Sequence, residues 1–150
     1  MNGVRRHADR KMYRRILLVS DGTPEADGAL EAAIALASRF GAELHMILVE
    51  ELPRFAVTIA EVDGEKQVAD RRAAFVITSA ERRAREAKVA FRSHVVVGHM
   101  IDHVLDFVNE HQIDLLVVAF RAPSNALSLF LTNRTERLIR LAPCDVHVVK

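Results

Sequence analysis

The alternation of apolar and polar residues along the chain predicts five strands. Three short, continuous apolar runs indicate strands that are buried on both faces, as in a parallel sheet: residues 16–19, 44–49 and 114–119. Residues 89–97 alternate between apolar and polar side chains, which is typical of an edge strand with one partly solvated face. A last apolar run, residues 146–149, is expected to be another buried strand.

The segments between these strands carry apolar residues at helical spacing. After the first strand, Thr23 and Pro24 indicate a helix start with Thr23 as its cap, and Gly41 indicates a left-handed helix end. Residues 51–62 show no clear period and are predicted to be a loop, and a long helix follows over about residues 63–87. Two shorter helices flank the third buried strand. The order predicts an α/β fold with a five-stranded, parallel, doubly wound sheet and helices on both faces.

Composition then narrows the class of protein. The 150 residues suit one domain. The single cysteine, Cys144, excludes an intrachain disulfide and indicates a reducing compartment, so a cytoplasmic location is expected. No apolar run reaches the roughly 18 residues that span a bilayer, and membrane insertion is therefore not expected.

Charge is unevenly distributed along the chain. Residues 1–15 contain six basic residues and one acidic residue, whereas the rest contains 15 basic and 19 acidic residues. We interpret residues 1–14 as a flexible basic tail and residues 15–150 as the domain. Because the domain is mildly acidic, nucleic acid is not an expected partner. The long helix carries arginines that are predicted to face solvent: Arg71, Arg72, Arg82, Arg83 and Arg85.

The carboxyl ends of the strands are where an open parallel sheet binds ligands. Asp21 follows the first of these strands and could accept hydrogen bonds from a ribose or a purine. Equally, it could be a turn aspartate that bonds backbone amides near the helix start. His99 and His103 would share one face of a helix, but without a third ligand they are interpreted as exposed side chains rather than a zinc site. No general base, nucleophile or metal cluster converges on these strand ends, so catalysis is not expected.

Several segments resemble the universal stress protein family, and together they cover nearly all of residues 15–150. They are residues 16–23 (ILLVSDGT), 29–37 (ALEAAIALA), 41–49 (GAELHMILV), 113–119 (IDLLVVA) and 135–149 (TERLIRLAPCDVHVV). The resemblance implies the strand order 3-2-1-4-5. It also implies homodimers, commonly formed through the last strand, whose apolar residues here are Val146, Val148 and Val149.

Members of the family that bind ATP carry a glycine motif after the fourth strand: Gly, two residues, Gly, nine residues, Gly, then Ser or Thr. In this chain the same spacing falls on Ala119, Ala122, Thr132 and Asn133. Glycines let backbone amides approach phosphates closely, and here all three are replaced by residues with side chains. Asn133 could still cap the short helix that precedes the last strand, or donate its amide to an anion.

The sequence therefore predicts a dimeric protein similar to universal stress protein A, in the branch that does not bind ATP. It is expected to act on an unknown protein partner through binding, with no catalysis, cofactor or metal. The alternative is a regulatory module that binds ATP or AMP, because a purine contact at Asp21 and the Val49 backbone would survive the loss of the glycines. The candidate nucleotide-binding residues are Asp21, Val49, Ala119, Ala122, Thr132 and Asn133.

Overall fold

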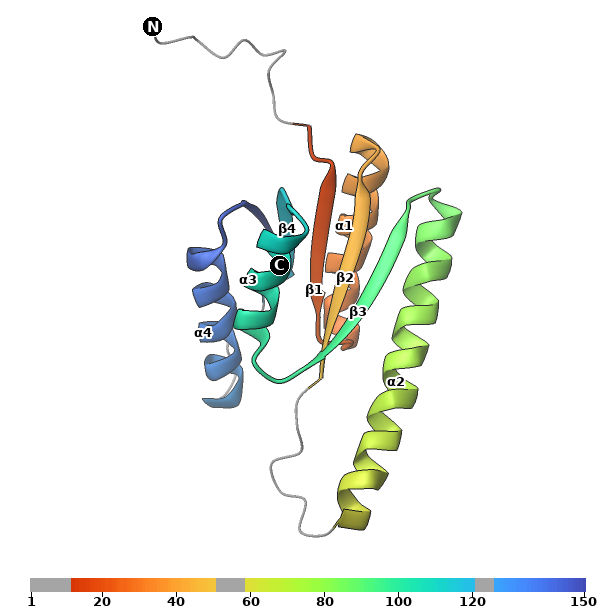
Figure 1. Cartoon of the computed structure of the whole chain (residues 1–150), viewed down its shortest axis with the longest axis vertical. Coiled ribbons are helices and arrows are strands. Elements are labelled where there is room, and N and C mark those ends of the chain that lie inside the picture. The colour runs from red at the N-terminus through yellow and green to blue at the C-terminus, as the bar shows by residue number, and fades with distance from the viewer. Residues whose placement is uncertain (1–11, 51–58, 121–125) are drawn as a thin grey trace, which may run out of the picture.

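The computed structural model describes residues 12–50, 59–120 and 126–150, without the side chains of residues 59–66, 69 and 126–133. Its centre is a sheet of five parallel strands in the order β3-β2-β1-β4-β5 (Figure 1). The strands are β1 (Arg15–Ser20), β2 (Glu43–Glu50), β3 (Phe91–Val97), β4 (Leu115–Ala119) and β5 (Asp145–Val149). The predicted fold class and strand order are both confirmed.

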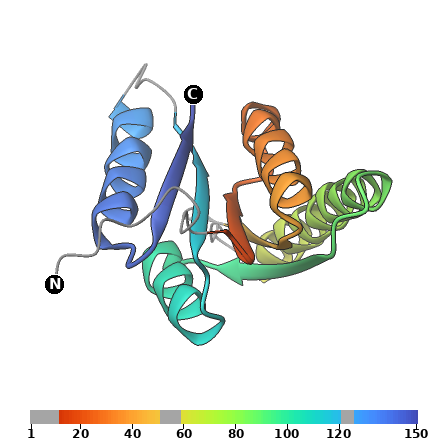
Figure 2. The same cartoon turned by 90° about the horizontal axis from the view of Figure 1, so that it is seen from above.

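Helices cover both faces of the sheet, as predicted. Figure 2 shows α1 and α2 on one side of the sheet, and α3 and α4 on the other. The helices are α1 (Asp27–Phe40), α2 (Ile59–Glu86), α3 (Met100–Glu110) and α4 (Ala126–Leu141), with a short 3-10 turn, η2 (Pro24–Ala26), before α1. Among the described residues, no helix combines the length and apolar character that crossing a membrane requires.

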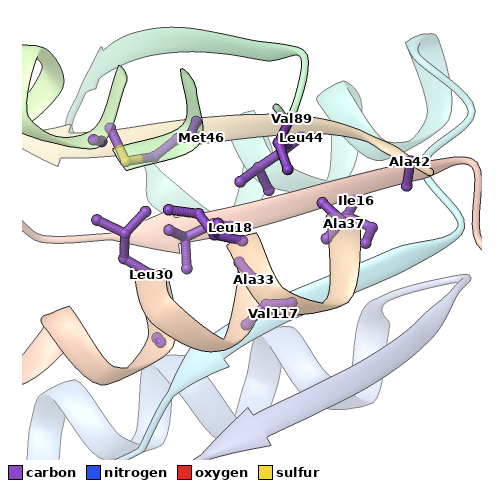
Figure 3. Packing of buried hydrophobic residues seen from close by; sticks show 14 of the residues in the cluster. Ile16, Leu18, Leu30, Ala33, Ala37, Ala42, Leu44, Met46, Val89 and Val117 are labelled. Carbon is purple, nitrogen blue, oxygen red and sulfur yellow. The ribbon is translucent and has the colours of Figure 1, made fainter. Parts of the chain in front are cut away.

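Each face of β1 supports a separate apolar core, which explains why its sequence is continuously apolar. Ile16 and Leu18 face α1 and α2, whereas Leu17 faces α3 and α4, and all three are fully buried. Figure 3 shows the first core, in which Leu30 and Ala33 of α1 lie over the strands. Burial of both faces is expected for a central strand of a doubly wound sheet.

The start of α1 differs from the prediction, and its end agrees. Thr23 occupies the cap position of η2, but its side chain makes no capping hydrogen bond, and the α-helix begins only at Asp27. The Thr23 hydroxyl bonds Asp21 instead, so the predicted cap is wrong. Gly41 ends the helix with φ +64°, and the Ala42 N–H donates to the Ala37 carbonyl as a left-handed helix end requires.

Helix α2 begins at Ile59, four residues before the predicted start at residue 63; the rest of the predicted loop, residues 51–58, lies outside the described residues. Its amino-terminal part projects beyond the carboxyl edge of the sheet (Figure 1). Arg83, which was predicted to face solvent, instead pairs with Asp27 and, at 3.4 Å, with Glu31 on α1. These ion pairs help to hold α2 against α1.

The two edge strands differ in how well the sequence predicted them. Among the strands that the structure describes, β3 pairs only with β2, as an alternating strand at the edge should. β5 forms the other edge, and three of its five residues are exposed, so the predicted buried strand is wrong for the single chain. An apolar run does not reveal whether its second face is covered by a helix.

The packed structure begins before residue 15, inside the segment that was interpreted as a tail. The Tyr13 hydroxyl donates a hydrogen bond of 2.8 Å to Asp145 Oδ2, and its ring meets Phe40 edge to face at 5.2 Å. The Arg14 N–H donates to the Asp114 carboxylate at 3.0 Å. Tyr13 and Arg14 are therefore attached to the domain.

Candidate functional site

The strand order reverses between β1 and β4, and this position defines the candidate site. The chain leaves β1 toward α1 on one face, whereas it leaves β4 toward α4 on the other. Open parallel sheets bind ligands at the carboxyl ends of the strands beside such a reversal. Because Ser20 aligns with Leu48 and Val19 with Val118, the structure brings Asp21, Val49 and Ala119 to the same edge.

Asp21 lies in a tight turn after β1. Its Oδ1 accepts hydrogen bonds from the Thr23 backbone N–H at 2.9 Å and from the Thr23 hydroxyl at 2.6 Å. The Gly22 N–H donates to Ser20 Oγ at 3.1 Å. This is the bonding of a turn aspartate, so a ligand contact at Asp21 would have to be made in addition to these bonds.

Gly22 packs against β2 and α2, and this packing brings Arg72 to the site. Gly22 has φ +73°, and a Cβ built on it would lie 3.3 Å from Leu48 Cδ1 and 3.4 Å from Val76 Cγ2. The same position lies 3.9 Å from Arg72 Nη2. A guanidinium group therefore stands beside the turn at the carboxyl end of β1. The sequence prediction placed Arg72 only on a solvated surface, although its position one turn before Val76 was a usable signal.

Glu50, the last residue of β2, is a second site residue that sequence reasoning missed. Its carbonyl accepts a hydrogen bond from the Gly98 N–H at 3.0 Å, which fixes the backbone. Its side-chain Oε1 is buried and has no hydrogen-bond partner among the described residues. A buried acceptor without a donor costs about 1–3 kcal/mol. A hydroxyl or amino group of a ligand would supply that donor.

The first position of the glycine motif offers little to a phosphate. Ala119 is half-buried at the end of β4, and the next amide, the Phe120 N–H, donates to the Val149 carbonyl at 2.8 Å. Ala122 lies outside the described residues, as do the side chains of Thr132 and Asn133. Because α4 begins at Ala126, Asn133 falls inside this helix, and the prediction that it caps a short helix is wrong.

Carboxylates surround the point where the first helix begins. Asp21, Glu25 and Asp27 follow one another over one turn and the start of α1, and all three are exposed. Asp27 is paired with Arg83. A helix start that binds phosphate presents unpaired amides and a positive dipole end, and negative side chains there oppose a further anion.

A metal is not supported by the part of the chain that the structure describes, where no group of three or more His, Cys, Asp or Glu residues could hold an ion. His99 precedes α3 in a left-handed conformation, with φ +45°, and His103 lies in the first turn; both are exposed.

Comparison with known proteins places this chain in a protein family. A sequence model of the Universal stress protein family matches residues 12–150. The chain belongs to the universal stress protein family. A curated universal stress protein of Methanocaldococcus jannaschii is 24% identical over 152 residues, covering 100% of this chain and 89% of that protein.

Solved structures of other universal stress proteins share the fold at low sequence identity. The universal stress protein UspA from Lactobacillus plantarum superposes with a TM-score of 0.74 and 21% identity, covering 93% of this chain and 99% of that one. A universal stress protein in complex with cAMP superposes with a TM-score of 0.71 and 22% identity, again covering 93% and 99%. At these identities the comparison establishes the shared architecture alone.

Proposed function

We propose that this universal stress protein acts as a homodimer that binds a partner protein in the cytoplasm, without catalysis and without bound ATP. One observation supports the absence of bound ATP, namely the hydrogen bond between the Phe120 N–H and the Val149 carbonyl. An amide that is already used within the sheet cannot donate to a phosphate.

Three further features disfavour a triphosphate at this edge. Ala119 adds a methyl group at the first glycine position of the motif. The start of α1 carries carboxylates rather than a free positive end, as described above. Arg72 supplies a single positive charge beside Gly22. A triphosphate carries several negative charges and needs a cradle of free amides, to which the Phe120 N–H cannot contribute because it is already bonded.

The test is to purify the protein without added nucleotide, denature it, and analyse the supernatant by chromatography. We expect no stoichiometric ATP, and no rise in melting temperature with millimolar ATP, since a ligand stabilises the state it binds. A combined variant that restores the motif, with Ala119→Gly, Ala122→Gly, Thr132→Gly and Asn133→Ser, should gain ATP affinity. Ala90→Gly, at an exposed position before β3, controls for added glycine. Stoichiometric ATP in the unmodified protein would contradict the proposal.

An adenine mononucleotide is the second candidate ligand, and Arg72 and Glu50 favour it. Asp21, the Val49 backbone and Glu50 Oε1, which has no hydrogen-bond partner among the described residues, would contact the nucleoside, and the guanidinium of Arg72 would match one phosphate. The relative that was solved with cAMP supports a ligand of this size. Calorimetric titration with AMP and cAMP tests the idea. Arg72→Gln should abolish nucleotide binding, whereas Arg71→Gln, a change at the exposed neighbouring residue, should leave it intact. An equal loss of affinity in both variants would count against a specific phosphate contact.

The dimer is proposed to form through β5. Val148 is 37% exposed, and Leu141, at the end of α4, is 50% exposed. An edge strand with exposed apolar side chains and unpaired backbone groups is a template for pairing with another strand. Sedimentation should give a dimer for the unmodified protein and a monomer for Val148→Lys. Val95→Lys, an exposed valine on the opposite edge strand β3, should remain dimeric. Dissociation by Val95→Lys alone would place the interface at β3.

A further inference from the structure

Three histidine rings and one phenyl ring gather between the sheet and α3, at the amino-terminal end of β2. His45 comes from β2, His94 from β3, and Phe107 and His111 from α3 and the residue that follows it. The ring centroids of His45 and His94 are 5.8 Å apart, and those of Phe107 and His111 are stacked at 3.8 Å. Phe107 also lies 4.7 Å from His94 and 5.4 Å from His45. We call these four residues the histidine cluster.

The cluster joins α3 to two strands. The carboxyl-terminal half of α3 contacts β2 and β3 through Phe107 and His111, and Val104 and Val108 are buried on the same face of the helix. α3 is the helix that covers this side of the sheet near β3 (Figure 2). The rings therefore form part of the contact that keeps α3 in place.

The buried nitrogen atoms of the cluster suit neutral imidazoles. His45 is only 4% exposed, and its Nε2 lies 3.2 Å from Glu43 Oε1, so a proton on Nε2 meets an acceptor. Its Nδ1 and the Nε2 of His94 are buried without a hydrogen-bond partner among the described residues. A second proton on either ring would create a buried N–H donor without an acceptor, which is costly.

Electrostatics favour the same neutral state. Burial lowers the pKa of His45 below 6.5, and the positive charges of His94, His111 and Arg92 lower it further, while Glu43 opposes this. Burial also lowers the pKa of His94, assisted by His111 and Arg92.

Few groups near the cluster can balance additional positive charge. Glu43 on β2 is the carboxylate that contacts His45, and it also lies 3.2 Å from Arg92 Nε on β3. From β1, Arg15 Nη1 donates to the His111 carbonyl at 3.4 Å. The Nδ1 of His111, just after α3, lies 3.3 Å from the Phe107 carbonyl. Acidification therefore adds positive charge beside Arg92, at a place where Glu43 is the carboxylate in contact with His45.

We propose that the histidine cluster is an acid-sensitive latch, which holds the carboxyl-terminal half of α3 on β2 and β3 and releases it when the rings become protonated. Release would uncover the apolar surface of Val104 and Val108 and the strand residues beneath them. The device goes beyond the proposed binding function and does not depend on a nucleotide.

The direction of the pH effect follows from the lowered pKa values. A released or unfolded chain binds protons at the ordinary histidine pKa of 6.5, whereas the closed form binds them only at lower pH. The closed form is therefore fully stable above pH 6.5, and it loses stability as the pH falls below that value. The loss stops growing once the pH passes below the pKa values of the closed form.

Hydrogen exchange measured by mass spectrometry at pH 7.5 and 5.5, corrected for intrinsic exchange rates, tests the latch. We expect protection of peptides from the carboxyl-terminal half of α3 to fall about fivefold or more at the lower pH, while peptides from α1 keep theirs. The double variant His45→Phe and His94→Phe keeps aromatic rings without titration and should lose this response. His103→Gln, an exposed histidine on the same helix, and His147→Gln, an exposed histidine on β5, should retain it.

Nuclear magnetic resonance titration of the imidazole protons in the unmodified protein gives an independent result, even if the double variant does not fold. The midpoints of His45 and His94 should lie below 6.5. Midpoints at or above 6.5, equal loss of protection in α1 and α3, or an unchanged α3 at pH 5.5 would each overturn the proposal. Loss of the response in His103→Gln or His147→Gln would do so as well.

Discussion

The turn after β1 allows a sharp test of how the site is built, through Gly22→Ala. Gly22 has φ +73°, and the new Cβ would lie 3.3 Å from Leu48 Cδ1 and 3.4 Å from Val76 Cγ2. Gly41→Ala is the matched control, because Gly41 has φ +64° and no atom of the described residues outside its own neighbourhood in the chain lies within 4 Å of its added Cβ. The two variants share the backbone strain and differ in packing.

The expected losses in the free energy of unfolding follow from backbone strain and from packing. A left-handed conformation costs an alanine about 1–2 kcal/mol relative to glycine. The smaller freedom of the unfolded alanine chain offsets about 0.4–1 kcal/mol of this cost, so Gly41→Ala should lower the free energy of unfolding by about 1 kcal/mol. At Gly22 the methyl group also pushes against β2 and α2, and overpacking adds about 1–3 kcal/mol. Gly22→Ala should therefore cost about 2–4 kcal/mol.

Urea unfolding followed by circular dichroism measures both variants, and the protein concentration must be held constant because a dimer gains stability with concentration. Only the difference between the two variants tests the packing of the turn. If Gly22→Ala and Gly41→Ala are equally destabilised, the turn does not press on Leu48 and Val76. The packing of α2 against the turn, on which the position of Arg72 also depends, would then be wrong as well.

Three further predictions concern the contacts that hold the domain together. The hydrogen bond to Asp145 raises the pKa of Tyr13 to about 12, and the chain has one tyrosine, so absorbance titration should show a phenolate midpoint near that value and a lower one in Asp145→Asn. Tyr13→Phe should lower the free energy of unfolding by about 0.5–1.5 kcal/mol near neutral pH. The contribution of Tyr13 to stability should fade as the pH rises from 10 through 12, because only the protonated phenol donates the hydrogen bond to Asp145. Leu138→Ala should cost about 2–5 kcal/mol in urea unfolding, since Leu138 is buried between α4 and the sheet, whereas exposed Leu141→Ala should change the monomer little.

Much of the fold is visible in the sequence because the central strands are covered on both faces. Continuous apolar runs then mark β1, β2 and β4 almost residue by residue, and the alternation of β3 marks an edge. β5 shows where this reasoning fails, because its apolar run is exposed in the single chain. The start of α4 was also missed: the sequence predicted only a short helix before the last strand, whereas α4 runs over Ala126–Leu141.

The site was predictable where it depends on strand ends and not where it depends on helix packing. Asp21, Val49 and Ala119 could be grouped because parallel strands end at one edge of the sheet. Arg72 reaches that edge only through the way α2 lies against the Gly22 turn. Glu50 looks like any charged residue after a strand until its buried oxygen is seen to have no donor among the described residues.

The histidine cluster and the candidate nucleotide site share strand β2, where His45 lies near the amino-terminal end and Val49 and Glu50 lie at the carboxyl-terminal end. His45 and Val49 are four residues apart on β2, which separates them by about 13 Å. The start of α3 is fixed at the carboxyl edge by the hydrogen bond between the Gly98 N–H and the Glu50 carbonyl, whereas its other end is fixed by the cluster. Charging the cluster acts on the end of α3 that is farther from Glu50. The proposed latch can therefore loosen this helix in acid while the residues that would contact a nucleotide keep their places.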